Sequence, residues 1–125
     1  MRGLWAISVT ALLAGCVGTP SLNGSFGAPS FAALQQICSP AAPVDYGNDA
    51  QSVYTTFYDA YVANRHGKVS TADYCAFQGA IAQHYTTLGT SSDPQARDQW
   101  VAFFLDQRAK AISWRAAVDP TLRSG

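Results

Sequence analysis

The residues of this chain best suited to chemistry are two histidines, three cysteines and eight aspartates, and it has no glutamate. His66 and His84 form neither an HxxxH nor an HExxH pattern, so a metal site would need ligands that only the tertiary structure brings together. Neither a GxSxG nucleophile motif nor a GxxxxGKS/T phosphate-binding loop occurs. The aspartates lie mostly at expected helix ends, where they suit capping. We therefore expect no catalytic residue, no metal and no cofactor.

The segment from Val62 to Asp73 resembles a calcium-binding EF-hand loop, with Gly67 in the sixth place, an apolar eighth residue and an acidic twelfth. It departs from that pattern where the ligands matter most. Val62 takes the place of the first aspartate, His66 occupies the fifth place, and the final residue is the short Asp73 instead of a bidentate glutamate. We interpret the segment as a helix end, a short loop and the start of the next helix.

The first cysteine, Cys16, ends a sequence typical of exported proteins. Arg2 is followed by an apolar run, Leu4 to Ala14, which suits a signal-peptide core and is much shorter than the roughly 20 residues of a membrane-spanning helix. The run ends in Leu13, Ala14, Gly15 and Cys16, which resembles the lipobox of bacterial lipoproteins. An ordinary secretory signal with a chance cysteine is the alternative.

The lipobox resemblance implies removal of residues 1–15, a diacylglyceryl thioether on the Cys16 sulfur and acylation of the new N-terminus. An anchor of three acyl chains binds a lipid bilayer almost permanently, since each buried methylene contributes about 0.8 kcal/mol. Residue 17 is Val and not Asp, which resembles lipoproteins forwarded to the outer membrane. We therefore expect a periplasm-facing, outer-membrane location, with the inner membrane as the alternative.

After the lipidation site, residues 16–29 are expected to form a flexible tether before a helical domain at residues 30–125. The tether sequence is rich in Gly, Pro and Ser and shows no apolar periodicity. About thirteen such residues have a root-mean-square reach near 20 Å, so the domain stays close to the membrane. Alternatively, Leu22 and Phe26 dock on the domain or on a partner.

Apolar periodicity predicts an all-α fold of three main helices and a short N-terminal helix. The short helix covers 31–38 after Ser30. The second covers 50–66, with Asn48 and Asp49 as capping residues and Gly67 as its stop. The third starts at Ser70 or Thr71 and ends before Gly89. The fourth starts at Pro94 after Ser92 and Asp93, which is the clearest start signal in the chain, and runs to about Ala117.

The fourth predicted helix has two different apolar sides. One side is expected to face the core and carries Trp100, Val101, Phe104, Leu105, Arg108, Ala111, Ile112 and Arg115. Phe103 and Trp114, with Gln107 and Lys110 between them, lie on another side. Aromatic residues at a surface are typical of protein interfaces.

The two cysteines left after Cys16 are expected to form a disulfide, Cys38–Cys75, since an even pair in an oxidising compartment most often does. The bond would fasten the short helix to the third helix. Loop-closure entropy suggests a stabilisation of roughly 4 kcal/mol at most. A reactive thiol would want a nearby histidine or a CxxC partner, and the sequence has neither.

The overall composition also bears on function. Eight basic residues balance eight acidic ones, so no net field favours nucleic acid. Fifteen aromatic residues exceed what a small helical core plainly requires, and we name Tyr54, Tyr58, Phe103 and Trp114 as candidate partner-binding residues. The alternative is that they pack against the first helix and the tether.

These observations together predict a non-catalytic accessory lipoprotein that binds and positions a larger envelope protein, similar in size, anchor and helicity to pilotins or to small subunits of membrane-attached enzymes. One alternative is a ligand-binding or catalytic domain with a cleft between the second and fourth helices, lined by His84 and at least two aspartates. Another is a structural envelope lipoprotein without a defined partner.

Overall fold

A computed structural model describes residues 21–24 and 27–119, and this part of the chain is all-α, as predicted. The expected signal peptide, Cys16 and Phe26 lie outside the described residues. The elements follow one another as α2 (Phe31–Gln36), a 3-10 turn (Gly47–Asp49), α3 (Ala50–Arg65), α4 (Thr71–His84), a π-helical turn (Tyr85–Gly89) and α5 (Pro94–Val118). No helix in this part of the chain is long and apolar enough to cross a membrane.

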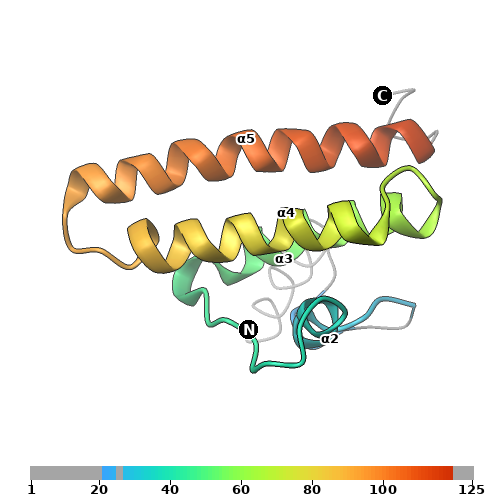
Figure 1. The fold of residues 1–125 in the computed structure, drawn as a ribbon, viewed down its shortest axis with the longest axis horizontal. Coiled ribbons are helices and arrows are strands. Elements are labelled where there is room, and N and C mark those ends of the chain that lie inside the picture. Colours follow the sequence, from blue (N-terminus) through green and yellow to red (C-terminus); the bar gives the residue numbers. More distant parts are fainter. Residues whose placement is uncertain (1–20, 25–26, 120–125) are drawn as a thin grey trace, which may run out of the picture.

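The three long helices form an antiparallel bundle, and the short helix α2 lies against one side of it (Figure 1). Helix α3 has its most extensive packing with α5, while α4 follows α5 along its length. The core lies between these helices. Its largest fully buried side chains are Trp100, Tyr46, Tyr54, Tyr74, Phe57, Leu34, Ile81, Val53 and Thr56.

Three helices start at the residues predicted from the sequence. The Ser30 hydroxyl accepts a hydrogen bond from the Ala33 N–H at 3.1 Å, and the Ser70 hydroxyl accepts one from the Asp73 N–H at 3.0 Å. Asp93 Oδ1 accepts from the Gln95 N–H at 3.1 Å, with Pro94 in the first turn of α5. These side chains satisfy backbone donors that have no partner inside the helix.

The predicted cap of α3 by Asn48 and Asp49 is wrong, because neither side chain caps that helix. A 3-10 turn leads directly into α3, and Asp49 Oδ2 instead accepts a hydrogen bond from Trp100 Nε1 at 3.2 Å. The end of α3 is as predicted. Gly67 follows it with a φ of +82°, a conformation that glycine adopts without steric cost.

The disulfide Cys38–Cys75 is confirmed, with the two Cα atoms 5.2 Å apart. It joins the chain just after α2 to α4, and hydrogen bonds from two glutamines add to this junction. Gln78 Nε2 donates to the Leu34 carbonyl at 2.9 Å. Gln35 Oε1 accepts from the Val44 N–H at 2.9 Å, which holds the following loop against α2.

The buried Gly89, at the end of the π-helical turn, allows close packing of two aromatic rings. A Cβ atom at Gly89 would lie 2.5 Å from Tyr85 Cδ1 and 3.2 Å from Trp100 Cγ. We expect Gly89→Ala to destabilise the protein by about 1–3 kcal/mol in urea unfolding, because a packed core resists added volume. The matched control is Gly79→Ala, where an added Cβ atom would meet no packed neighbour within 4 Å. This change should stabilise α4 by up to about 1 kcal/mol. Equal effects of the two changes would contradict the packing argument.

The predicted core face of α5 is too wide. Trp100, Phe104 and Ala111 are buried, whereas Val101, Leu105 and Ile112 are 46%, 58% and 43% exposed. Helices α3 and α4 both pack on the side of Trp100 and Phe104, so the neighbouring stripe stays at the surface. A three-helix bundle covers only part of a doubled apolar stripe.

Candidate functional site

Within the described part of the chain, neither histidine is hydrogen-bonded to another titratable side chain. His66 is exposed at the end of α3. His84 Nδ1 lies 2.8 Å from the Ala80 carbonyl oxygen, and its ring stacks on Phe103 with the two centroids 3.6 Å apart. Among residues 21–24 and 27–119, no group of three His, Cys or Asp side chains is placed to hold a metal ion.

Tyr54, one of the four predicted partner-binding residues, is a core residue with no exposed side chain to offer a partner. Its ring lies 5.4 Å from that of Phe31, and its hydroxyl donates a hydrogen bond to the Pro29 carbonyl at 2.5 Å. The inward orientation follows from the position of α2, which covers this side of α3.

The hydrogen bond from Tyr54 to Pro29 also shows where the expected tether meets the domain. Pro29 is held by Tyr54, and the Phe31 N–H donates to the Leu22 carbonyl oxygen at 2.9 Å. Ser21 and Gly24 close a turn through a bond from the Gly24 N–H to the Ser21 carbonyl oxygen at 2.9 Å. The described tether residues therefore contact the start of the domain through their backbone, whereas the Leu22 side chain is exposed. Docking of that side chain in a groove stays a prediction.

Tyr58 is half-buried beside a cation from another helix. The Arg115 guanidinium carbon lies 5.4 Å from the centre of the Tyr58 ring, and the Tyr61 ring lies 6.1 Å away. Arg115 thus contacts the face of this tyrosine while pairing with an aspartate of α3.

Phe103 and Trp114 both lie on the α4 side of α5, but at separate places: Trp114 lines a groove of about 360 Å³ between these helices, whereas Phe103 stacks on His84 and is not part of the groove lining. The Trp114 ring meets Phe77 edge to face at 5.2 Å, and Lys110 Nζ lies 5.5 Å from the Trp114 ring centre. Both Phe103 and Trp114 are half-buried. The groove is lined by Asp73, Ala76, Phe77, Ala80, Gln107, Lys110 and Trp114.

The groove is lined by side chains of mixed chemistry. It has two aromatic rings, an exposed acid on α4, an exposed base on α5 and an amide, Gln107. The residues Phe103, Gln107, Lys110 and Trp114 recur every three to four positions along α5, which is the sequence signal that identifies this side of the helix. The contribution of α4 to the groove could not be read from that pattern.

A second cavity, of about 270 Å³, lies between the loop after α2 and helix α4. The disulfide cysteines, Gln35 and Gln78 form part of its wall, and most of the remaining lining is apolar. Neither cavity includes His84, and the groove contains a single carboxylate, from Asp73. A pocket lined by His84 and at least two aspartates between α3 and α5 would have favoured the alternative of a ligand-binding or catalytic domain.

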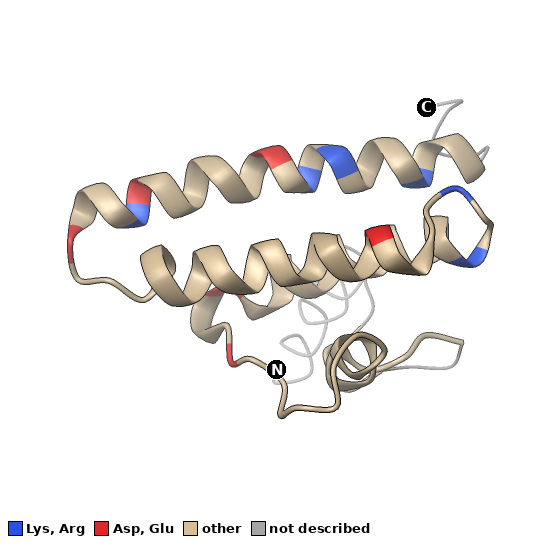
Figure 2. Cartoon of the chain, viewed as in Figure 1, with Lys and Arg blue, Asp and Glu red and all other residues tan. Residues whose placement is uncertain are grey.

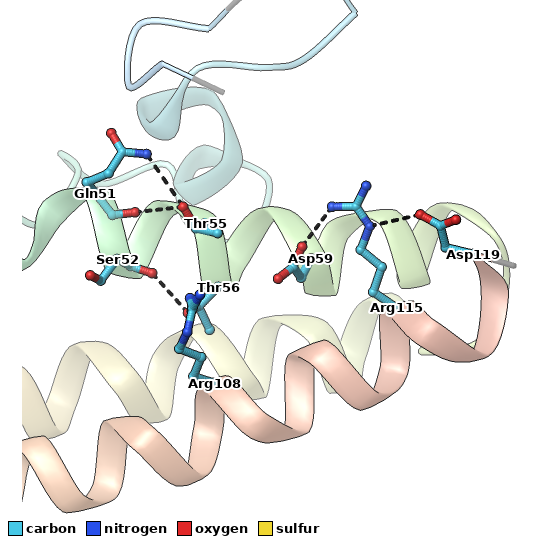
Figure 3. A network of polar contacts seen from close by, with 8 residues as sticks. All are labelled: Gln51, Ser52, Thr55, Thr56, Asp59, Arg108, Arg115 and Asp119. Carbon is cyan, nitrogen blue, oxygen red and sulfur yellow. Dashed lines mark hydrogen bonds and ion pairs between the residues drawn. The ribbon is translucent and has the colours of Figure 1, made fainter. Parts of the chain in front are cut away.

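A polar seam lies instead between α3 and α5 (Figure 3). Arg115 Nη1 donates to Asp59 Oδ1 at 2.7 Å, and Arg115 Nε lies 3.5 Å from Asp119 Oδ2. Arg108 Nη1 donates to the Thr56 hydroxyl at 3.4 Å. These contacts fix the rotation of α5 against α3, since an unpaired buried charge is costly.

Burial raises the pKa of Asp59, although the hydrogen bond and the positive charge of Arg115 oppose this shift. The folded state therefore binds the Asp59 proton more tightly than the unfolded state does. The contribution of Asp59 to stability is largest when it is protonated, and it falls as pH rises from about 4 through the raised folded pKa.

We expect the stability of the Asp59→Asn variant relative to wild type to increase as pH rises from about 4 through the raised pKa of Asp59 in the folded state. Above that pKa the difference should level off. Urea midpoints measured from pH 3 to pH 8 test this. The control is Asp106→Asn, which removes an exposed carboxylate from α5 and should follow the wild-type profile. A relative loss of stability with rising pH in Asp59→Asn would show that attraction to Arg115 outweighs desolvation.

No protein-family model matches the chain, and neither a curated protein nor a solved structure is detectably similar to it.

Proposed function

We propose that this protein is a membrane-anchored, non-catalytic accessory lipoprotein that binds a larger envelope protein through the groove between α4 and α5. The observation that carries the proposal is the half-buried Trp114, which lies between Phe77 and Lys110 in that groove. Aromatic side chains that are partly exposed in a concave, otherwise packed setting are the typical anchors of protein interfaces.

The charges at the groove suit a polypeptide partner. Asp73 lies on the α4 side and Lys110 on the α5 side, so a bound chain would meet a rim of both signs around an aromatic floor. Rim charges of this kind set orientation and specificity more than affinity. The main binding energy would come from burial of the exposed part of the Trp114 ring, because Phe77 is already buried in the core and only supports that ring.

The proposed anchor at Cys16 would keep the groove close to the bilayer. Because Leu22 is hydrogen-bonded to the start of α2, only the residues from Cys16 to Ser21 would separate the lipid from the domain. Six fully extended residues span at most about 22 Å. The partner surface would therefore lie near the membrane, which suits a subunit that positions an envelope complex.

Co-purification of the full-length protein from mild detergent extracts of membranes tests the proposal. We expect the amount of partner protein captured by the Trp114→Ala variant to be at least tenfold lower than the amount captured by wild type. This is the size of effect expected for an interface hot spot. Because Trp114 also packs on the core, Lys110→Glu provides a second variant that changes only an exposed groove residue, and it should also reduce capture.

The matched control is Ser113→Ala, which changes an exposed residue on another side of the same helix. It should leave capture unchanged. Circular dichroism and thermal unfolding establish that each variant is folded. Isolation of the wild-type domain without any bound protein, or equal loss in the control variant, would count against a partner at this groove.

A further inference from the structure

A second surface on α5 lies away from the groove. The side chains of Val101, Leu105 and Ile112 are all more than two-fifths exposed. Together with Arg108 they follow a spacing of four, three and four residues, which is the spacing of a seam between two packed helices. Three alanines at intervals of seven, Ala102, Ala109 and Ala116, run beside this stripe.

The alanines affect how closely another helix can approach. Ala102 and Ala109 are exposed and Ala116 is half-buried, so no large side chain holds a partner away along this edge. The distance between packed helix axes depends on the side chains at the contact, and small residues permit the closest approach. The stripe with its alanine border therefore has the shape of a helix-packing face, and we call it the α5 outer face.

The charges of α5 differ between its two halves. The first half, with its capping residue, carries three aspartates and one arginine, a formal charge of −2; these are Asp93, Asp98, Asp106 and Arg97. The second half carries three basic residues and one aspartate, a formal charge of +2; these are Arg108, Lys110, Arg115 and Asp119. Figure 2 shows red positions towards the start of α5 and most of its blue positions in the second half.

We propose that the α5 outer face pairs with the same face of a second copy of this chain, with the two helices antiparallel. In this orientation Asp98 of each copy meets Arg115 of the other, whereas a parallel pair would bring the two Asp98 side chains together. Asp106 and Lys110 lie off this face and contribute only to the overall charge difference between the halves. A two-fold arrangement makes both contacts identical, as expected for a homodimer.

The spacing also selects a register. When Val101 lies opposite Ile112 of the second copy, Leu105 lies opposite Arg108 of that copy and next to its Leu105. The same register places Asp98 opposite Arg115 of the second copy. Arg115 has five N–H donors and uses Nη1 for Asp59 and Nε for Asp119, so it has the capacity for a further carboxylate.

A single helix face buries less than the roughly 800 Å² per partner of a standard stable interface. We therefore expect a reversible dimer whose population rises with the local concentration of the protein. Confinement to one membrane raises that concentration without any new contact. This density effect rests on the proposed lipid anchor, whereas the pairing geometry does not.

Cysteine cross-linking of the full-length chain in membranes tests the pairing. Two differently tagged copies are co-expressed, one with Val101→Cys and one with Ile112→Cys, and mild oxidation is followed by non-reducing electrophoresis. We expect a mixed 101–112 dimer several-fold more abundant than either the 101–101 or the 112–112 dimer. A predominance of the 101–101 and 112–112 products would overturn the antiparallel orientation.

Two further variants separate specific pairing from random collision. Leu105→Cys alone should form a dimer, whereas Ser113→Cys, exposed on a different side of α5, should form several-fold less. Asp98→Arg should reduce the Leu105→Cys dimer several-fold, and Asp106→Arg, the same charge change off this face, should not. Equal yields in either matched pair, or a cross-linked product that is not twice the mass of the chain, would overturn the proposal.

Cross-linking of the chain without an added cysteine separates the proposal of lipidation at Cys16 from the proposal of pairing through the α5 outer face. A dimer formed by this protein would indicate a free thiol at position 16, which contradicts lipidation but leaves the contrast between positions 105 and 113 as the measure of pairing. Absence of that dimer, together with absence of the position 105 dimer, would reject pairing and leave the anchor intact.

Discussion

Replacement of Cys16 by serine is expected to abolish incorporation of labelled palmitate completely. A serine hydroxyl cannot form the thioether to diacylglycerol on which the proposed anchor depends. A single acyl chain gives only marginal, reversible attachment to a membrane, so the binding free energy of the proposed anchor comes from its three chains together. The serine variant would lose all of it. Labelling of growing cells with palmitate, followed by intact-mass measurement of the purified protein, tests this. The wild-type mass should lack residues 1–15 and include the acyl groups.

The matched control is Cys38→Ser, which changes another cysteine without touching the lipobox. Its palmitate incorporation should equal that of wild type at the same protein level. Wild-type protein that carries no label, or that keeps the N-terminal Met1, would contradict lipidation and with it the proposed location and accessory role.

Removal of the Cys38–Cys75 bond is expected to destabilise the domain by up to about 4 kcal/mol, the limit given by loop-closure entropy. The bond closes a loop of 37 residues in sequence separation, so its loss greatly enlarges the unfolded ensemble. The double variant with Ser at both positions, compared with wild type in urea at pH 7, tests this. A loss of this size is a large share of the 5–15 kcal/mol typical of small domains.

Added dithiothreitol provides an independent control for the disulfide. It should lower the wild-type urea midpoint to that of the double serine variant and leave the midpoint of the variant unchanged. A wild-type midpoint that does not respond to reduction, with the thiols shown to be free, would mean that the bond contributes little. The contacts of Gln78 and Gln35 would then hold α2 in place.

Much of the fold could be predicted because its signals are local. Ser30, Ser70 and Asp93 cap helices as predicted, and Gly67 adopts the left-handed conformation that its position after a helix suggests. The disulfide could be predicted because only two cysteines remained once Cys16 was assigned elsewhere. Asp49 is the exception among the caps, since a distant residue, Trp100, uses its carboxylate.

The candidate site was only partly predictable. Periodicity separated Phe103 and Trp114 from the main apolar stripe of α5, but it could not show that α4 would supply Asp73 and Phe77 to the same groove. Nor could it show that Tyr54 would be covered by α2 and bonded to Pro29. The apolar pattern of a helix shows which residues can be buried, whereas the neighbours decide which of them are buried.

The sequence by itself therefore determined the helical class, the helix starts, the disulfide partners and the expected lipidation signal, because each depends on a few adjacent residues or on residue type. Only the tertiary structure decided which sides of α5 face α4, α3 and solvent. That decision rests on the packing of Trp100 and Phe104 and on the Asp59–Arg115 pair, contacts between residues far apart in sequence whose geometry no local pattern contains.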